Sequence, residues 1–214
     1  VDDKDLDNVG LSWSGYADYK DMWTVDVFDV FNDTYGVEKN NISKEYIESS
    51  EKLNPSNRDN IIGIQSQIWS ETIRNEDILD YMFMPNIIVF SQKAWSKDPE
   101  WMKTSDKSKR ELTLDYEWNK FTNTIGQRVL PIIDNIYGGL SYDLPKPGGI
   151  IKNDSLYANS AFPGLNIKYT LDGSLPDNES MNYSSPVKLN QEDIVNLRLF
   201  DNKGRGGYPI QVDK

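Results

Sequence analysis

The sequence changes character at Asp143-Leu-Pro-Lys-Pro-Gly-Gly149, and this break constrains the fold more than any other feature. Two prolines and two glycines within seven residues end helical periodicity. Apolar residues recur at three- and four-residue steps before the break and alternate with polar residues after it. We therefore place a domain boundary here, with a mostly helical unit over residues 1–143 and a β unit over residues 144–214.

The helical unit carries its clearest signal just before the break. A long amphipathic helix is predicted there, bent at Pro131 and stopped by Gly138-Gly139. Its apolar face, expected to lie in the core, consists of Trp118, Phe121, Ile125, Val129, Ile132, Ile133 and Ile136. Asn75 is placed to cap an earlier helix, which Pro85 should kink or restart.

Two shorter elements are predicted upstream and two downstream of these helices. Residues 43–53 are typical of a short helix, and Ile61 to Trp69 is predicted to be a strand. Beyond the break, residues 165–171 and 195–199 alternate in the manner of strands, and Asp172-Gly173 is a hairpin-turn signal. About 65 residues of this kind predict a small β-sandwich, which by its size should depend on the helical part for stability.

Composition excludes several kinds of chemistry. The 214 residues include no His and no Cys, so no Ser-His-Asp or Cys-His nucleophile, disulfide or ordinary zinc, copper or haem site can form. The formal charge of −11 argues against nucleic acid and anionic membranes as partners and favours a neutral ligand. The apolar run from Tyr81 to Phe90 is too short to span a membrane. The opening Val-Asp-Asp-Lys-Asp has no initiator Met, so we expect a mature chain or a piece of a longer one.

The stretch Gly63-Ile-Gln-Ser-Gln-Ile-Trp-Ser-Glu71 is the most informative for function. In a strand, Trp69 and Glu71 would share one face. An indole can cover the apolar face of a sugar ring while a carboxylate accepts hydrogen bonds from its hydroxyls. The alternative is a core Trp at a strand end, with Glu71 capping the next helix.

Carboxylates elsewhere point to no metal site. Asp172, Asp177 and Glu179 fall in one turn-rich stretch that could bind Ca²⁺, but their spacing fits a hairpin loop better than a known ligand loop. We expect no metal and no cofactor.

The stretch around Trp69 also resembles the last barrel strand of family-20 glycoside hydrolases, the β-N-acetylhexosaminidases and chitobiases. The similarity continues through the helix that follows, the closing helix of the barrel, and the immunoglobulin-like module that ends the bacterial enzymes. The matching segments are Gly63 to Arg74, Leu79 to Met82, Pro85, Ala94-Trp95, Trp118 to Phe121, Ile125 to Pro131, Tyr142 to Gly148, Pro163 to Gly173 and Asn202 to Arg205.

The resemblance implies an α+β chain: a mostly helical C-terminal remnant of a (β/α)₈ barrel followed by an immunoglobulin-like β-sandwich. It also implies that Trp69 floors the sugar at the non-reducing end and that Glu71 binds its outer hydroxyls. Gly10-Leu-Ser-Trp13 is similar to a chitobiase loop whose Trp stacks on the next sugar, although Trp13 could equally be a packing residue in a lid loop. Asn86 and Asp143 stand where the family commonly has Arg, which bears on local packing and the interdomain exit.

The family's catalytic Asp-Glu pair follows a His-x-Gly-Gly motif, and this chain has no His. In such enzymes the substrate's own acetamido oxygen attacks the anomeric carbon, an exception to the two-carboxylate scheme. The resemblance therefore implies sugar-binding residues without catalytic ones, so the chain alone should be inactive.

The resemblance further implies an exo-acting β-N-acetylhexosaminidase as the parent. The partners would be an N-acetylglucosamine-terminated oligosaccharide and the remainder of the barrel, in a periplasmic, cell-surface or secreted bacterial setting. The alternatives are a non-catalytic carbohydrate-binding module and a structural interaction domain in which Trp13 and Trp69 are buried.

Overall fold

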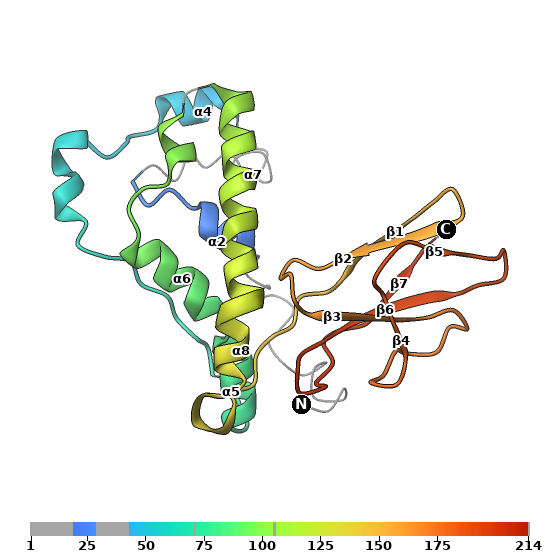
Figure 1. The fold of residues 1–214 in the computed structure, drawn as a ribbon. Coiled ribbons are helices and arrows are strands. Elements are labelled where there is room, and N and C mark those ends of the chain that lie inside the picture. Colours follow the sequence, from blue (N-terminus) through green and yellow to red (C-terminus); the bar gives the residue numbers. More distant parts are fainter. Residues whose placement is uncertain (1–18, 29–42, 71, 105, 214) are drawn as a thin grey trace.

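The computed structural model describes residues 19–28, 43–70, 72–104 and 106–213. A group of helices lies beside a β-sandwich, and the two parts meet along the end of the longest helix (Figure 1). This is the predicted α+β architecture, a helical part followed by an antiparallel sandwich.

The helical part runs from residue 19 to residue 138. Its elements are α2 (Tyr19–Thr24), α4 (Lys44–Ser49), η1 (Pro55–Asn60), α5 (Glu76–Phe83), α6 (Asn86–Trp95), η2 (Glu100–Lys103), α7 (Lys107–Thr124), η3 (Ile125–Val129), α8 (Leu130–Ile133) and η4 (Ile136–Gly138). The expected cap is present, because the Asn75 side chain accepts a hydrogen bond from the Ile78 backbone at the start of α5. The expected interruption at Pro85 separates α5 from α6. The short helix predicted over residues 43–53 ends earlier, at Ser49.

The long amphipathic helix contains a π-helical turn, η3, between α7 and α8. The Leu130 N–H donates to the Ile125 carbonyl five residues earlier, so η3 holds one residue more than an α-helical turn. That extra residue shifts the phase of the side chains that follow. Ile125 and Ile133 are buried as predicted, whereas Ile132 is exposed, because the prediction carried a period of 3.6 residues straight through the turn. Ile136 is also exposed, and it lies in η4, beyond the end of α8.

The predicted strand from Ile61 to Trp69 is wrong. Residues 61–70 connect η1 to α5 without regular secondary structure. A strand exists only when a neighbour accepts its backbone hydrogen bonds, and every strand in the described ranges lies between Gly148 and Val212, in sheets of their own.

The sandwich consists of two antiparallel sheets, with strand orders β1-β2-β5 and β4-β3-β6-β7. The strands are β1 (Gly148–Lys152), β2 (Ser155–Asn159), β3 (Asn166–Thr170), β4 (Met181–Asn182), β5 (Val187–Lys188), β6 (Val195–Phe200) and β7 (Ile210–Val212). The two alternating stretches become β3 and β6, which pair with Tyr169 opposite Leu197. Gly173, at φ +81°, turns the chain after β3 as Asp172-Gly173 predicted.

One hydrophobic core spans both parts of the molecule. In the helical part, Trp118 and Phe121 pack on the buried Trp23, with ring centroids 5.5 and 6.0 Å from its ring, so they are partly buried at the edge of the core. Phe162, from the loop between β2 and β3, is fully buried in this same cluster. The sandwich has a second core of its own around Leu156 and Leu197. The sandwich therefore depends on the helices for part of its burial, as its small size predicted.

The two parts also make a close backbone contact at Gly126, within η3. A Cβ at this position would lie 2.0 Å from the Pro163 carbonyl oxygen, so only glycine allows the loop to approach. The π-helical turn thus presents bare backbone where the sandwich docks. Within the described ranges, no helix is both long and apolar enough to cross a bilayer.

Candidate functional site

Trp69 is the one sequence-predicted site residue that falls within the described ranges. It lies near the end of the irregular segment 61–70, and its side chain is 65% exposed. The neighbouring apolar side chains of Ile68 and Ile62 are also exposed, the latter to 99%. An exposed indole offers a flat apolar face with a hydrogen-bond donor at its edge, which suits a sugar ring.

Trp69 is followed by a turn that leads into α5. The Ile73 backbone N–H donates to the Ser70 carbonyl at 3.1 Å, and the Asn75 cap then begins the helix. Glu71 and Trp13 lie outside the described residues. The pairing of Glu71 with Trp69 and the stacking of Trp13 on the next sugar therefore stay predictions, and the strand geometry that motivated the pairing is not present in residues 61–70.

Helix α5 is fixed at its far end by one carboxylate. Asp143 Oδ1 accepts a hydrogen bond from the Tyr81 hydroxyl at 2.6 Å, and Oδ2 accepts one from the Tyr19 hydroxyl at 2.7 Å. The Asp143 backbone N–H also donates to the carbonyl of Met84, the residue that ends α5, at 2.9 Å. Loss of solvation raises the pKa of Asp143, while the two tyrosine hydroxyls and Lys146 act to lower it. Asp143 therefore ties α2 and α5 to the linker, residues 139–147, which connects η4 to β1.

The sandwich also touches α5 directly. Ile78 and Tyr81 form a small buried cluster with Met82 and with Tyr208 from the sandwich. Lys146, from the linker, lies over the Tyr208 ring at 5.2 Å from its centroid. The helix that follows Trp69 is therefore held by both the linker and the sandwich.

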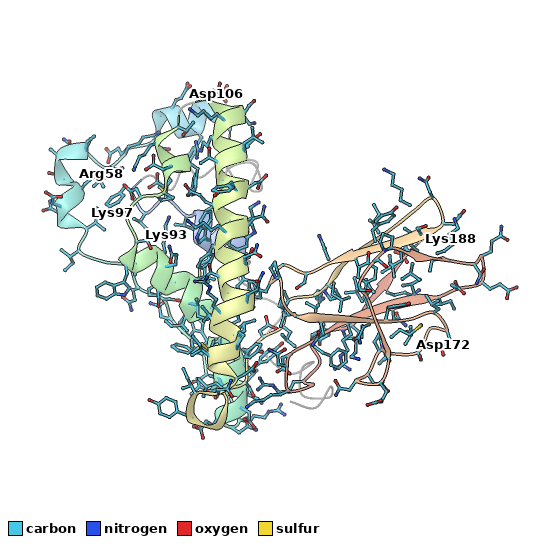
Figure 2. The ribbon with its side chains drawn as sticks, in the orientation of Figure 1. Arg58, Lys93, Lys97, Asp106, Asp172 and Lys188 are labelled. Atoms are coloured by element: carbon cyan, nitrogen blue, oxygen red, sulfur yellow. The ribbon has the colours of Figure 1, made fainter. Side chains whose placement is uncertain are left out.

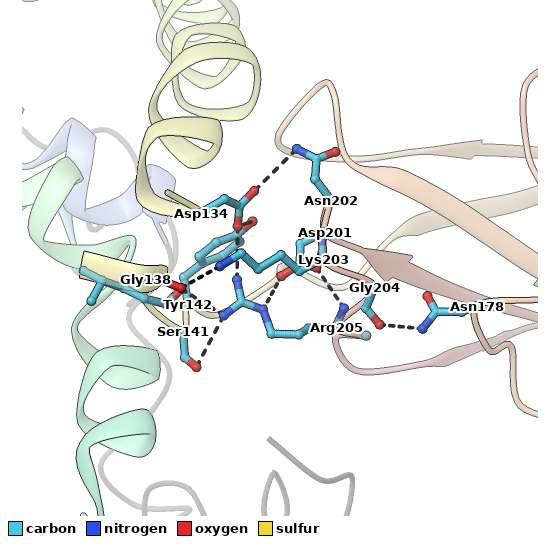
Figure 3. A network of polar contacts seen from close by, with 12 residues as sticks. Asp134, Gly138, Ser141, Tyr142, Asn178, Asp201, Asn202, Lys203, Gly204 and Arg205 are labelled. Atoms are coloured by element: carbon cyan, nitrogen blue, oxygen red, sulfur yellow. Dashed lines mark hydrogen bonds and ion pairs between the residues drawn. The ribbon is translucent and has the colours of Figure 1, made fainter. Parts of the chain in front are cut away.

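Arg205 connects the sandwich to the end of the helical part (Figure 3). Its Nη2 lies 3.1 Å from Asp134 Oδ1, its Nη1 donates to the Leu140 carbonyl at 2.9 Å, and its Nε donates to Asp201 Oδ2. Both carboxylates are almost fully buried. The guanidinium also lies 5.0 Å from the centroid of the Tyr142 ring. One cation thus pairs with two buried carboxylates, Asp201 within the sandwich and Asp134 across the junction.

Neighbouring groups complete this junction. The Tyr142 hydroxyl donates to Asp134 Oδ1 at 3.1 Å, and Lys203 Nζ donates to the Gly138 carbonyl at 3.0 Å. Burial raises the pKa of Tyr142, and the Asp201 and Asp134 carboxylates raise it further, so the phenol stays protonated and can donate. The sequence analysis included Arg205 in a segment that resembles the family, but it did not single out Asp134. The sequence feature that marks Asp134 is an acidic residue directly after the apolar Ile132-Ile133 pair.

The acidic stretch after β3 behaves as a loop. Asp172 accepts hydrogen bonds from the backbone N–H and hydroxyl of Ser174, and Asp177 accepts them from Ser180. These bonds lower the pKa of both carboxyl groups. Asp172 projects from the sandwich at the end remote from the helices (Figure 2).

The junction contains a partly open pocket of about 20 Å³, room for roughly one water molecule. It is lined by Tyr81, Ser141, Tyr142, Leu144, Arg205, Gly206 and Gly207. The pocket is too small for a sugar ring. An open surface at Trp69 is thus the better candidate for sugar contact.

Two family models match this chain in sequence order. The catalytic domain of glycosyl hydrolase family 20 matches residues 6–98, and the chitobiase/β-hexosaminidase C-terminal domain matches residues 130–207. The chain belongs to glycoside hydrolase family 20. The catalytic-domain match includes Trp13, Trp69 and Glu71, and the C-terminal match begins at Leu130, the first residue of α8.

Two curated relatives are similar to this family-20 chain, one over about half of its length and the other over most of it. An N,N'-diacetylchitobiase of Vibrio harveyi is 33% identical over 120 residues, which cover 52% of this chain and 13% of the relative. A β-hexosaminidase of Vibrio vulnificus is 32% identical over 168 residues, covering 71% of this chain and 19% of the relative. The family-20 chain thus spans less than a fifth of the length of each relative.

Proposed function

We propose that this chain is the C-terminal part of an exo-acting β-N-acetylhexosaminidase. The parent would remove terminal N-acetylglucosamine or N-acetylgalactosamine from oligosaccharides by substrate-assisted, retaining hydrolysis. The observation that carries the proposal is the exposed Trp69 within the stretch matching the family-20 catalytic domain. Relatives that are a chitobiase and a β-hexosaminidase support the same activity.

In this proposal the chain binds sugar and does not cleave it. Trp69 covers the apolar face of the terminal sugar, Glu71 accepts hydrogen bonds from its outer hydroxyls, and Trp13 stacks on the next sugar. The catalytic Asp-Glu pair belongs to the remainder of the barrel, which would also cover Ile62 and the exposed segment around it. The parent would act in the periplasm, at the cell surface or outside a bacterial cell.

A non-catalytic carbohydrate-binding module is the second candidate. The exposure of Trp69 is compatible with it, since such a module binds glycans through exposed aromatic rings. A purely structural role predicts a buried Trp69, and the 65% exposure of its side chain argues against that role.

Hydrolysis is tested with a nitrophenyl β-N-acetylglucosaminide, on the chain alone and on the full-length polypeptide. Turnover by the full-length protein but not by the chain is the expected result. No turnover by either would replace hydrolysis with the binding-module proposal. Turnover by the chain alone would show that the catalytic carboxylates lie within it.

Binding is tested by titrating the 214-residue chain with N-acetylglucosamine and following tryptophan fluorescence. Trp69→Ala should abolish the change, while Trp95→Ala, which replaces an indole that is 89% exposed, should preserve it. Equal responses from the two variants would remove Trp69 from the site.

A further inference from the structure

The hydrogen bonds at Asp143 require a side chain with two acceptor oxygens, which is a carboxylate. Each of its two oxygens accepts a hydrogen bond from a different tyrosine, Tyr81 on α5 and Tyr19 on α2. An asparagine would offer one acceptor and one donor, so it could keep one of these tethers in its present form but not both. The two hydrogen bonds therefore depend on both acceptor oxygens of Asp143, which an asparagine of the same shape lacks.

The same residue stands between the sandwich and the helix that follows Trp69. On one side, the Asp143 backbone N–H holds the Met84 carbonyl at the end of α5. On the other, the linker is held by the sandwich, because Arg205 binds the Leu140 carbonyl and Gly207 approaches Leu144 so closely that a Cβ there would lie 2.7 Å from the Leu144 Cβ. The position of α5 therefore depends on the position of the sandwich, because the linker contacts both.

Helix α5 in turn sets the course of the chain at Trp69. The helix begins at Glu76, six residues after Ser70 and directly after the turn that Ile73 and Ser70 form. Its buried residues Ile78 and Tyr81 face the sandwich's Tyr208. A shift of α5 relative to the linker would therefore move the anchored end of the segment that carries Trp69.

We propose that Asp143 is a positioning residue, which holds α5 against the linker and so fixes the sugar-facing segment at Trp69. This inference rests on the proposed sugar-binding function. It gives the sandwich a role in that function, since the sandwich orients the linker from which Asp143 projects. Among the described residues no cation is in ion-pair contact with the partly buried Asp143 carboxylate, so its loss of solvation weakens the fold, and its retention is consistent with a positioning role.

The experiment compares the full 214-residue chain with Asp143→Asn, Tyr81→Phe and the double variant. Asp172→Asn, which changes an exposed carboxyl on the far end of the sandwich, is the matched control. Affinity for N-acetylglucosamine is measured by titration well below the unfolding temperature. Hydrogen–deuterium exchange is followed in residues 72–84, with β6 as the internal reference.

Asp143→Asn and Tyr81→Phe should each weaken sugar binding by about threefold to tenfold, a part of the value of one hydrogen bond to a charged group, because the effect reaches the sugar only through α5. In the double variant the two effects should be less than additive, because both substitutions act on the contact between Asp143 and Tyr81. Exchange should accelerate in residues 72–84 and stay unchanged in β6. Asp172→Asn should match the wild type in both measurements.

Two outcomes overturn the inference in distinguishable ways. If the wild type binds sugar and Asp143→Asn binds it equally well, Asp143 does not position the segment, whatever its effect on exchange, and the proposed function stands. If the wild type binds no sugar, the proposed function fails and the positioning role fails with it.

Discussion

The Arg205 guanidinium lies 3.1 Å from the carboxylate of Asp134, which is 71 residues earlier in the chain and almost fully buried. Removing a cation from such a pair leaves the buried anion without compensation, and here Asp201 would lose its partner as well. We predict that Arg205→Met lowers the free energy of unfolding by about 3 kcal/mol. Urea denaturation followed by circular dichroism measures the difference.

The matched control for Arg205 is Lys188→Met, at an ion pair with Asp154 in which both side chains are largely exposed. Exposed pairs contribute little, so the change should be below about 0.5 kcal/mol. Equal effects of the two substitutions would mean that the junction around Arg205 is not a stabilising element.

Gly126→Ala tests the docking of the sandwich on the π-helical turn. The new methyl group would overlap the Pro163 carbonyl, and both sides of this contact are backbone, so neither can move aside cheaply. We predict a loss of about 3 kcal/mol and an unfolding transition that separates into two. Gly63→Ala, where a Cβ would meet nothing within 4 Å, should leave stability unchanged or slightly raised. A single, unshifted transition in Gly126→Ala would show that the loop can retreat.

The two tryptophans Trp69 and Trp101 should separate function from stability. Trp101 is 2% exposed and packs on Trp23, so Trp101→Ala should cost about 3–5 kcal/mol in unfolding free energy. Trp69→Ala should change stability by less than about 0.5 kcal/mol, because its indole is mostly in solvent. Thermal unfolding distinguishes them, and a large destabilisation by Trp69→Ala would identify Trp69 as a packing residue instead.

The raised pKa of Asp143 predicts a pH dependence of stability with a definite sign. Because the folded-state pKa lies above the ordinary value of 3.8, the folded protein binds more protons than the unfolded chain between the two values. The contribution of this group is therefore fully present below pH 3.8 and is lost as pH rises through the raised pKa. The unfolding free energy of the wild type minus that of Asp143→Asn should fall as pH rises toward neutrality. A difference that grows with pH would contradict the shift.

Tyr137 tests local strain. Its backbone is left-handed, at φ 50° and ψ 32°, and its side chain is almost fully exposed, so no burial offsets the conformation. Tyr137→Gly should therefore raise stability by about 1 kcal/mol. Tyr116→Gly, in the middle of α7 and also exposed, should lower it by a similar amount. Chemical denaturation of both variants shows whether their effects have opposite signs.

The features that were predictable from sequence are those decided by neighbouring residues. The Asn75 cap, the break at Pro85, and the alternation that became β3 and β6 each depend on spacing within a few positions. The strand over Ile61 to Trp69 failed because a strand requires partners, and the pattern of one segment cannot supply them. The inward placement of Ile132 failed because one extra residue in η3 rotated it to the surface.

The candidate site was predictable only in part. Trp69 is exposed, as a sugar platform requires, while the pairing with Glu71 and the role of Trp13 remain predictions. The junction of Asp134 with Arg205, and of Asp143 with Tyr19 and Tyr81, joins residues far apart in sequence, and no periodicity encodes such contacts.

The burial of Phe162 among the helices limits how this sandwich could be exchanged between genes. A crossover at the Pro-Gly-rich linker would deliver a module in which Phe162 has lost its helical neighbours and Arg205 has lost Asp134. A crossover ahead of η3 would carry the docking turn, α8 and Asp134 along with the strands. Recombination that keeps this module folded is therefore expected to cut inside the helical part, upstream of Ile125, and not at the visible change in composition.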